Sequence, residues 1–415
     1  MSLTNSWTGG QYSLFRAVLG AYLCVHFVQL APWAVELFSS EGVIPNAADS
    51  PLIYLFPNVL ALADGPQFVT ALVVVAAVAA ALFAAGYNDR IAALVLWYIW
   101  ACLVGRNPLI INPGMPYVGW ILLAHACIGG APYGSWKARG RLDPGGGWRM
   151  PSGIFTVAWV LMALGYSYSG YTKLVSPSWL DGTALVRVLN NPLARPTALR
   201  ELMAGLPETI LKLATWGALG FELLFAPLAL VRRLRPVVWV GMLLMHASLM
   251  VLIDFVDLSL GMVMLHLFTF DPAWIKPRDR SATEPIFYDG GCGLCHRTVR
   301  FVLAEDSDGA AFRFAPLGGE RFLQDVPEPQ REGLPDSIVV LRADGRLLIR
   351  SAAVLHILAR LGGLWRLASV LGHIVPAVLR DGIYDLIARV RHRMFRRPAD
   401  ACPMLPPELR SRFDA

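Results

Sequence analysis

Charged residues are scarce in this 415-residue chain: 16% of the sequence is charged, whereas 55% is hydrophobic. Soluble domains carry about 25% charged residues, so the scarcity argues against a wholly soluble protein and favours a lipid-facing surface. The scarcity is uneven, because apolar runs recur up to about residue 272 and charged residues are frequent afterwards. Composition therefore predicts a membrane domain over residues 1–275, a Pro- and charge-rich linker over 276–284 and a soluble domain over 285–415.

Nucleotide-binding motifs are also absent: the sequence has no GxxxxGK[ST] and no strand-linked GxGxxG, so nothing indicates a nucleotide site. The net charge of +6 does not indicate a nucleic-acid partner, because the basic residues lie mostly in loops between apolar runs and in the tail. Membrane topology accounts for that distribution. The first residues, MSLTNSWTGGQYSLF, lack a basic region and a cleavage site, so we expect the first apolar segment to be retained.

Long apolar runs are what the first half has in excess. A transmembrane helix needs about 17 to 25 mostly apolar residues. By this criterion we expect a polytopic all-α bundle of about eight spans, the third and eighth being short or interrupted. The spans cover residues 12–36, 66–87, 90–106, 115–133, 153–174, 209–230, 236–256 and 258–275.

The orientation follows from lysine and arginine in short loops, which are retained on the cytoplasmic side. The most basic loops are 136–149 and 232–235, and three basic residues follow the last span within 276–280. With eight spans these segments share one side, which places both termini and the soluble domain in the cytoplasm. The loop 175–208 then lies outside, although its three arginines argue in the other direction.

Two of the six cysteines, Cys292 and Cys295, form a CxxC pair in IFYDGGCGLCHRTVRFVL. The segment predicts a buried strand, a glycine turn and a helix with one apolar face. Cys292 is expected at or just before the first helical turn, where unpaired N–H groups and the helix dipole favour a thiolate and make it the nucleophile. Cys295 can then close a disulfide and release a bound partner. This order of elements is typical of a thioredoxin-like redox unit.

Two other interpretations of the pair are weaker. A zinc site needs a second CxxC or a pair of histidines nearby, and the tail offers only scattered His296, His356, His373, His392 and Cys402. A structural disulfide is disfavoured because we expect the tail to lie in the reducing cytoplasm. We therefore predict thiol-disulfide exchange and no metal.

The stretch YDGGCGLCHRTVRFVLAEDSDGAAFRFAPL, with the later SAAVLHILARLGGLWRL, YDLIARVRHRMF and CPMLP, resembles the DCC family of thiol-disulfide oxidoreductases over about 285–405. The resemblance implies a thioredoxin-like fold with Asp289, Cys292 and Cys295 as signature residues. Asp289 can orient the turn or accept a proton from Cys295, and the sequence does not choose between these roles. The implied partners are a thiol or disulfide protein or a small-molecule thiol.

Two further residues follow from this resemblance. Cys402 matches an additional C-terminal cysteine often seen in the family, and it is either an unpaired surface thiol or a resolving one. Pro335, in GLPDSIVVL, precedes a strand near the place where thioredoxin-like folds have a cis-proline beside the disulfide.

The membrane half contains GYSYSGYTKLVSPSWLDGTAL, in which Lys173 ends an apolar segment among hydroxyl groups that include those of Tyr168 and Tyr171. A lysine in this position commonly anchors a span at the headgroups. If Lys173 instead faced the bundle interior, desolvation would favour its neutral form and let it act as a base. The hydroxyl groups could hold a polar ligand group within the bilayer.

Residues 12–275 resemble the HTTM family, the vitamin K-dependent carboxylase-like transmembrane domain. The residues that carry the resemblance are Ser169, Gly170, Lys173, Leu174, Trp179, Asp181 and Gly182. It implies that Lys173 is the base that deprotonates a reduced quinone, and that His246 matches a late histidine-containing segment. On physical grounds alone, His246 is equally an interhelical hydrogen-bond partner.

The sequence also departs from the carboxylases. Their Asn-His pair corresponds here to Asn112 followed by Pro113, and no large lumenal domain follows the membrane part. Carboxylation of protein glutamates is therefore not expected. Binding of a quinone or of another isoprenoid or acyl lipid stays open.

Three functional hypotheses remain. The protein is a membrane-bound thiol-disulfide oxidoreductase of a bacterial inner membrane, where this pairing of domains is usual, with a membrane domain that binds a quinone or other lipid. Alternatively, it is a lipid- or quinone-modifying enzyme that uses Lys173, with the CxxC domain as a redox regulator. In the third hypothesis, the spans only tether the redox domain to the bilayer.

Overall fold

The chain folds into two compact units in the computed structural model, which describes residues 3–335, 337–394 and 405–414. Unit 1 includes residues 17–129 and 151–270, and unit 2 includes residues 5–16, 130–150 and 271–414. The junction at 270/271 lies close to the linker expected from composition. The linear division did not include the two early segments of unit 2, because composition carries no information on their long-range contacts.

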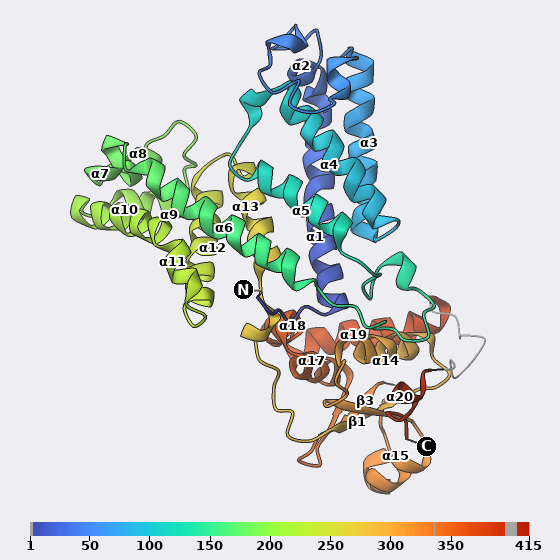
Figure 1. Ribbon diagram of the computed structural model, residues 1–415. Coiled ribbons are helices and arrows are strands. Elements are labelled where there is room, and N and C mark those ends of the chain that lie inside the picture. The colour runs from blue at the N-terminus through green and yellow to red at the C-terminus, as the bar shows by residue number, and fades with distance from the viewer. Residues whose placement is uncertain (1–2, 336, 395–404, 415) are drawn as a thin grey trace. The chain divides into compact units, whose positions relative to one another are not determined.

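Unit 1 is helical, and its first helix, α1, begins in unit 2. Its helices are α1 (Gly9–Leu30), α2 (Ala34–Phe38), α3 (Pro66–Ala85), α4 (Asp89–Arg106), α5 (Met115–Cys127), α6 (Ser152–Lys173), α7 (Pro177–Leu180), α8 (Ala184–Leu189), α9 (Ala198–Ala204), α10 (Glu208–Leu223), α11 (Phe225–Leu230), α12 (Arg235–Leu252) and α13 (Asp257–Thr269). The helix α4 packs between α3 and α5, and α6 packs against α10, α11 and α13 (Figure 1).

Four helices of the described residues are long and apolar enough to cross a membrane. They are Gly9–Phe38, which joins α1 and α2, and the helices Pro66–Ala85, Ser152–Lys173 and Arg235–Leu252. These four are compatible with a membrane protein, but the expectation of eight spans is not supported.

The other four expected segments fail on length, continuity or charge. The helices α5 and α13 have 13 residues each, and at 1.5 Å per residue they reach about 20 Å, short of the roughly 30 Å hydrocarbon core. The segment 209–230 is divided between α10 and α11 at Leu224. The 18 residues of α4 include three charged ones. The sequence prediction counted apolar residues across helix ends that it could not locate.

Unit 2 contains a four-stranded mixed sheet in the order β2-β1-β3-β4. The strand β1 (Glu284–Tyr288) pairs in parallel with β2 (Phe312–Pro316) and antiparallel with β3 (Val339–Leu341), which pairs antiparallel with β4 (Leu347–Ile349). A parallel pair needs a crossover, which α14 (Gly293–Glu305) supplies between β1 and β2.

Further helices surround this sheet in unit 2 (Figure 1). They are α15 (Glu320–Asp325), α16 (Glu328–Arg331), α17 (Arg350–Leu361), α18 (Gly363–Ile374), α19 (Ala377–Met394) and α20 (Pro407–Arg410). The short 3-10 helices of the two units are Ala31–Trp33, Ala47–Asp49, Val59–Ala61, Pro108–Ile110, Trp136–Ala138 and Pro272–Trp274.

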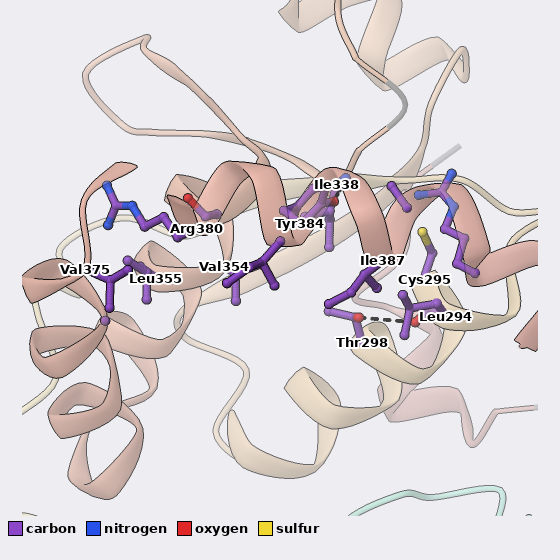
Figure 2. A pocket seen from close by; sticks show the side chains of 15 residues that line it. Leu294, Cys295, Thr298, Ile338, Val354, Leu355, Val375, Arg380, Tyr384 and Ile387 are labelled. Atoms are coloured by element: carbon purple, nitrogen blue, oxygen red, sulfur yellow. Dashed lines mark hydrogen bonds between the residues drawn. The ribbon is translucent and has the colours of Figure 1, made fainter. Parts of the chain in front are cut away.

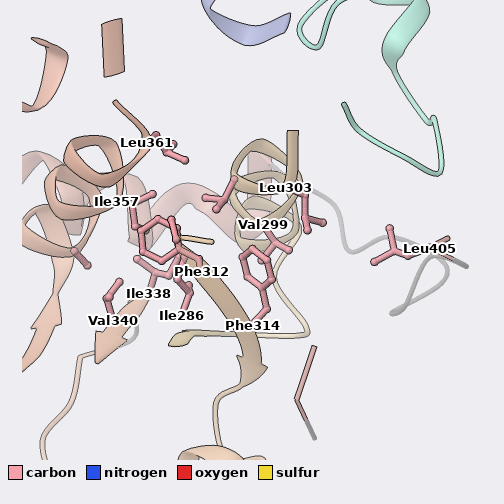
Figure 3. Close-up of a cluster of buried hydrophobic side chains, with 13 residues drawn as sticks. Ile286, Val299, Leu303, Phe312, Phe314, Ile338, Val340, Ile357, Leu361 and Leu405 are labelled. Carbon is pink, nitrogen blue, oxygen red and sulfur yellow. The ribbon is translucent and has the colours of Figure 1, made fainter. Parts of the chain in front are cut away.

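Side-chain alternation along the strands divides the core of unit 2 between the two faces of the sheet. On one face, Ile286 joins a buried cluster with residues of α14 and α17 (Figure 3). The labelled members of that cluster are Ile286, Val299, Leu303, Phe312, Phe314, Ile338, Val340, Ile357, Leu361 and Leu405. On the other face, Phe287 packs against Phe322 of α15, with ring centroids 5.0 Å apart. This packing holds the N-terminus of α14 at the end of β1.

A buried carboxylate attaches the early segment 5–16 to the rest of unit 2. Glu305, at the end of α14, is 4% exposed and accepts hydrogen bonds from the Thr8 hydroxyl, from Gly10 N at 2.7 Å and from the indole N–H of Trp365 at 2.6 Å. Burial raises the pKa of Glu305, although these hydrogen bonds oppose the shift.

Candidate functional site

The CxxC pair lies where β1 turns into α14. Cys292 is the N-cap residue of α14, with φ −101° and ψ 119°. Its carbonyl accepts the backbone N–H of His296 at 3.1 Å, and its own N–H donates to Asp289 O at 3.2 Å. Strand, turn and helix are therefore arranged as the sequence predicts. The Cys292 sulfur lies at a helix N-terminus, where unpaired N–H groups favour negative charge.

The two thiols are free and differ in their surroundings. The pKa of Cys295 is raised to about 12, mainly by burial and also by the charge of Cys292 and a side-chain hydrogen bond with Cys292. A backbone hydrogen bond from Asp289 and the charge of Arg391 oppose the shift. A raised pKa keeps the proton on Cys295 and so lowers its reactivity as a nucleophile.

Both sulfurs are shielded from solvent in this state, since Cys292 is 1% exposed and Cys295 is 5% exposed. A disulfide substrate therefore needs either a local opening of the turn or a route through the interior.

Asp289 connects the turn to α19. One carboxylate oxygen accepts the N–H of Gly291 at 2.8 Å, and the other lies 3.7 Å from the guanidinium of Arg391. Of the two roles that the sequence left open, orientation of the turn is the one with a hydrogen bond in this structure.

Arg391 is a site residue that the sequence analysis missed. The basic run RHRMFRR (391–397) is typical of a solvated helix end, but Arg391 is 2% exposed. Its spacing from Arg380, Tyr384 and Ile387 places it on the helix face that these residues share, and this periodicity was the available signal. Its charge is therefore held beside both Asp289 and Cys295.

A cavity of about 450 Å³ adjoins Cys295 (Figure 2). Its lining is Leu294, Cys295, Thr298, Ile338, Ser351, Val354, Leu355, Gly372, Val375, Arg380, Ile383, Tyr384, Ile387, Ala388 and Arg391. The side chains are mostly apolar, and some polar ones bond within the protein: Thr298 donates to Leu294 O at 3.2 Å, and the Tyr384 hydroxyl accepts Ile338 N at 3.1 Å. A volume of this size suits a small ligand or an apolar side chain.

Comparison with known proteins bears on this site. The family of DCC1-like thiol-disulfide oxidoreductases matches residues 286–397. The chain is 33% identical over 132 residues to the uncharacterized protein YuxK of Bacillus subtilis, which covers 31% of this chain and 91% of that protein. It is 30% identical over 135 residues to a chloroplastic DCC family protein of Arabidopsis thaliana, covering 32% of this chain and 77% of the relative. The chain belongs to the DCC family. No solved structure matches it.

The family match places Asp289, Cys292 and Cys295 inside the DCC domain. It concerns unit 2, and the resemblance of residues 12–275 to the HTTM family stays a prediction.

The prediction that Pro335 is a cis-proline is wrong, because Pro335 is among the described residues and these contain no cis peptide bond. The chain turns here at Gly333, whose φ of +81° suits glycine, so the turn does not require a cis bond. Ile338, three residues after Pro335, is the residue of this loop that reaches the cavity. Cys402 lies outside the described residues.

Two histidines of the DCC domain are engaged in structural contacts. His296 packs against the Tyr288 ring at 6.2 Å, and His356 bonds with the buried carboxylate of Glu284 at 2.6 Å. The described residues show no group of three His, Cys, Asp or Glu side chains that could hold a metal ion.

Lys173 ends α6 and is paired with residues of unit 1. Its ammonium donates to the Ser169 hydroxyl at 2.8 Å, forms an ion pair with Glu222 of α10 and lies 5.0 Å from the Trp179 ring. Glu222 is 5% exposed. The sequence analysis missed it, although a carboxylate within an apolar segment is a functional signal.

The other residues predicted for a site around Lys173 do not contact it in this structure. Tyr168 and Tyr171 are 68% and 66% exposed and do not join the Lys173 contacts. Asn112 is buried, and its side chain accepts Gly114 N at 2.9 Å, a local contact that holds the turn before α5.

His246 takes part in a second buried polar group. The Tyr166 hydroxyl bonds with His246 at 2.8 Å and with His266 at 2.6 Å, and His246 contacts the Ser259 hydroxyl at 3.3 Å. The sequence analysis did not select Tyr166 for this role or His266 at all.

Proposed function

We propose that the protein is a membrane-bound thiol-disulfide oxidoreductase in which Cys292 attacks and Cys295 resolves. Membership of the DCC1-like family supports a redox function. The observation that carries the assignment of roles is the position of Cys292 as the N-cap residue of α14, with Cys295 one turn further into the helix.

In the proposed reaction, two electrons pass from the Cys292–Cys295 dithiol to a substrate disulfide. The Cys292 thiolate attacks one sulfur of a substrate disulfide, forms a mixed disulfide and releases the first substrate thiolate. Cys295 then passes its proton to the released thiolate or to solvent and attacks the Cys292 sulfur, which releases the second substrate thiolate and leaves the Cys292–Cys295 disulfide. Two thiol groups of a partner reduce this disulfide by the reverse exchange and are themselves oxidised to a disulfide. The charge of Arg391 favours the Cys295 thiolate in the second step, and Asp289 holds the turn. Since both sulfurs are buried, the first step requires a local opening around residues 289–292.

A thioredoxin-like fold is part of this proposal. The sheet order β2-β1-β3-β4, the parallel β1 and β2, and a CxxC at the start of the crossover helix support it.

The proposed location is a bacterial inner membrane, with the DCC domain in the reducing cytoplasm. Four helices of suitable length and hydropathy support a membrane location. In this compartment a CxxC pair serves exchange rather than permanent cross-linking.

The test is equilibration of the full chain, in lipid nanodiscs, with glutathione buffers of stepped potential, followed by alkylation and mass spectrometry. We expect a reversible disulfide between Cys292 and Cys295 that Cys292→Ser abolishes. An unreactive pair, or a pair that retains zinc, would overturn the proposal.

A second candidate function is modification or binding of a quinone or other lipid by unit 1. The contact that favours it is the Lys173–Glu222 ion pair, which offers a donor and an acceptor to a polar ligand group. Lys173→Ala should then abolish binding of reduced quinone analogues to the reconstituted chain, while Cys292→Ser leaves it intact. Equal binding by both variants would leave the spans as a tether, the third hypothesis.

A further inference from the structure

Unit 2 exposes a run of large apolar side chains, here called the α18–α19 apolar surface. Ten of them lie between Leu367 and Ile387 and are each at least 40% exposed, with Ile374 at 75% and Val378 at 83%. Among the other described residues from 271 to 414, Leu323 is the large hydrophobic residue with comparable exposure, at 48%. Soluble domains rarely leave such a patch uncovered, so it indicates an interaction surface.

The packing of α18 shows that this exposure is built into the fold. The inner face of α18 carries small residues: the Ser369 hydroxyl donates to Leu355 O at 2.7 Å, and a Cβ at Gly372 would come within 2.5 Å of the Leu355 side chain. Close approach to α17 therefore needs small residues inside, and the large apolar ones, such as Ile374, lie outside. The helix is amphipathic with its apolar side outward, as in helices that lie in a membrane interface.

The charges of this region fit an anionic surface. The acids of α19 are engaged by α17, since Ser351 bonds with Asp381 and Arg350 lies 3.1 Å from Asp385. Arg380, between the apolar residues of α19, has two buried guanidinium nitrogens, Nε and Nη1, with no hydrogen-bond partner in the described part of the chain. Because Nε and Nη1 are themselves buried, a phosphate would interact with the guanidinium through its positive charge.

The connection of unit 2 to a candidate membrane span indicates that the partner of this surface is the lipid bilayer. The helix α1 begins in unit 2, at Gly9, and continues as part of the candidate span Gly9–Phe38. A unit that contains the first turns of a membrane helix is held at the bilayer surface.

We propose that the α18–α19 apolar surface docks on the membrane, with its apolar side chains at the acyl boundary and Arg380 at the phosphates of anionic lipids. This inference goes beyond the proposed redox function and rests only on the membrane location. It also has a consequence for the site: Val375, Ile383 and Ile387 belong both to this surface and to the lining of the cavity at Cys295. Docking therefore turns the cavity toward the lipid, where an apolar group can enter it.

The experiment places the full chain in nanodiscs that contain a lipid with a photoreactive acyl chain, and maps the cross-linked peptides by mass spectrometry. We expect labelling of the candidate spans and also of residues 367–387, and none of the peptide that contains Leu323. The variant Val378→Glu should lose the labelling of 367–387, while the matched exposed variant Leu323→Glu keeps it. Arg380→Gln should reduce labelling from phosphatidylglycerol discs by up to about fivefold and leave labelling from phosphatidylcholine discs unchanged.

The other labelling results separate failure of the docking proposal from failure of the membrane location. Labelled spans with an unlabelled 367–387 segment overturn the docking proposal. In that case, cross-links from this segment to a second copy, or to unit 1 of the same chain, identify the group that covers it. If the spans also remain unlabelled, the membrane location itself fails, and the proposed redox function still stands on its own test.

Discussion

The guanidinium of Arg391 lies 3.7 Å from the carboxylate of Asp289, and its charge also acts on the thiol of Cys295. One buried arginine of α19 thus lies beside both the turn of the CxxC segment and Cys295. Substitution of Arg391 or of Asp289 should therefore change the behaviour of the CxxC pair.

Arg391→Gln should slow the resolution of a mixed disulfide. Burial already raises the pKa of Cys295 to about 12, and loss of the opposing charge raises it further. We expect resolution up to about tenfold slower, the factor that corresponds to one pKa unit. Stopped-flow mixing with a disulfide substrate and acid quench measures this rate. Arg389→Gln, exposed on the same helix, should resolve at the wild-type rate, and an unchanged rate in Arg391→Gln would contradict the assignment.

Asp289→Asn and Asp289→Ala separate the two roles of this residue. Asparagine keeps the oxygen that accepts Gly291 N, whereas alanine removes it. If Asp289 orients the turn, the asparagine variant should retain thiol exchange, and the alanine variant should lose about 0.5–1.5 kcal/mol of stability. Loss of exchange in a stably folded asparagine variant would instead show proton transfer through Asp289.

Glu284 should make the DCC domain sensitive to acid. Burial alone would raise its pKa, but hydrogen bonds from His356 and Ala343 N and the charge of Arg360 outweigh burial and lower it. A lowered pKa contributes stability that is present above the ordinary glutamate pKa of 4.5 and is lost as the pH falls through the folded-state pKa. Thermal unfolding between pH 3 and 7, roughly spanning this range, should show the loss.

Glu284→Gln tests the same group by substitution. It leaves the buried Arg360 without its carboxylate partner, so we expect a loss of about 3–5 kcal/mol at neutral pH. Glu320→Gln, at an exposed acid of α15, is the matched control and should change little. Similar melting curves for both variants would refute a stabilising role of the buried pair.

Glu305 should have the opposite effect to Glu284 on the pH dependence of stability. Burial raises its pKa, so its contribution to stability is fully present below the ordinary glutamate pKa of 4.5 and is lost as the pH rises through the higher folded-state pKa. Hydrogen exchange of residues 5–16, which its carboxyl group holds, should therefore become faster as the pH rises through this window, after correction for intrinsic exchange. Glu305→Gln should remove that pH dependence.

The local elements of the site could be predicted from the sequence because adjacent residues determine them. The apolar strand, the glycine turn and the helix around Cys292 are all encoded within residues 286–303, and the structure has them in that order. Arg391 could not be assigned in this way, because its burial depends on the packing of α19 against α14, about a hundred residues apart.

In the N-terminal helical part, too, the sequence predicted local composition better than helix ends and long-range partners. Apolar composition located the regions of the helices, but eight spans were expected where four helices qualify, since helix ends such as Cys127 and the break at Leu224 leave little trace in composition. Lys173 was selected from sequence, whereas its partner Glu222 is 49 residues away and was not.

The most direct test of the account is the reaction of the Cys295→Ser variant, as full chain in nanodiscs, with oxidised glutathione. The account predicts that one glutathione accumulates on Cys292 as a stable mixed disulfide, and that Cys292→Ser forms no adduct at Cys295. An unmodified Cys292 in the Cys295→Ser variant, or an adduct at Cys295 in the Cys292→Ser variant, would contradict it.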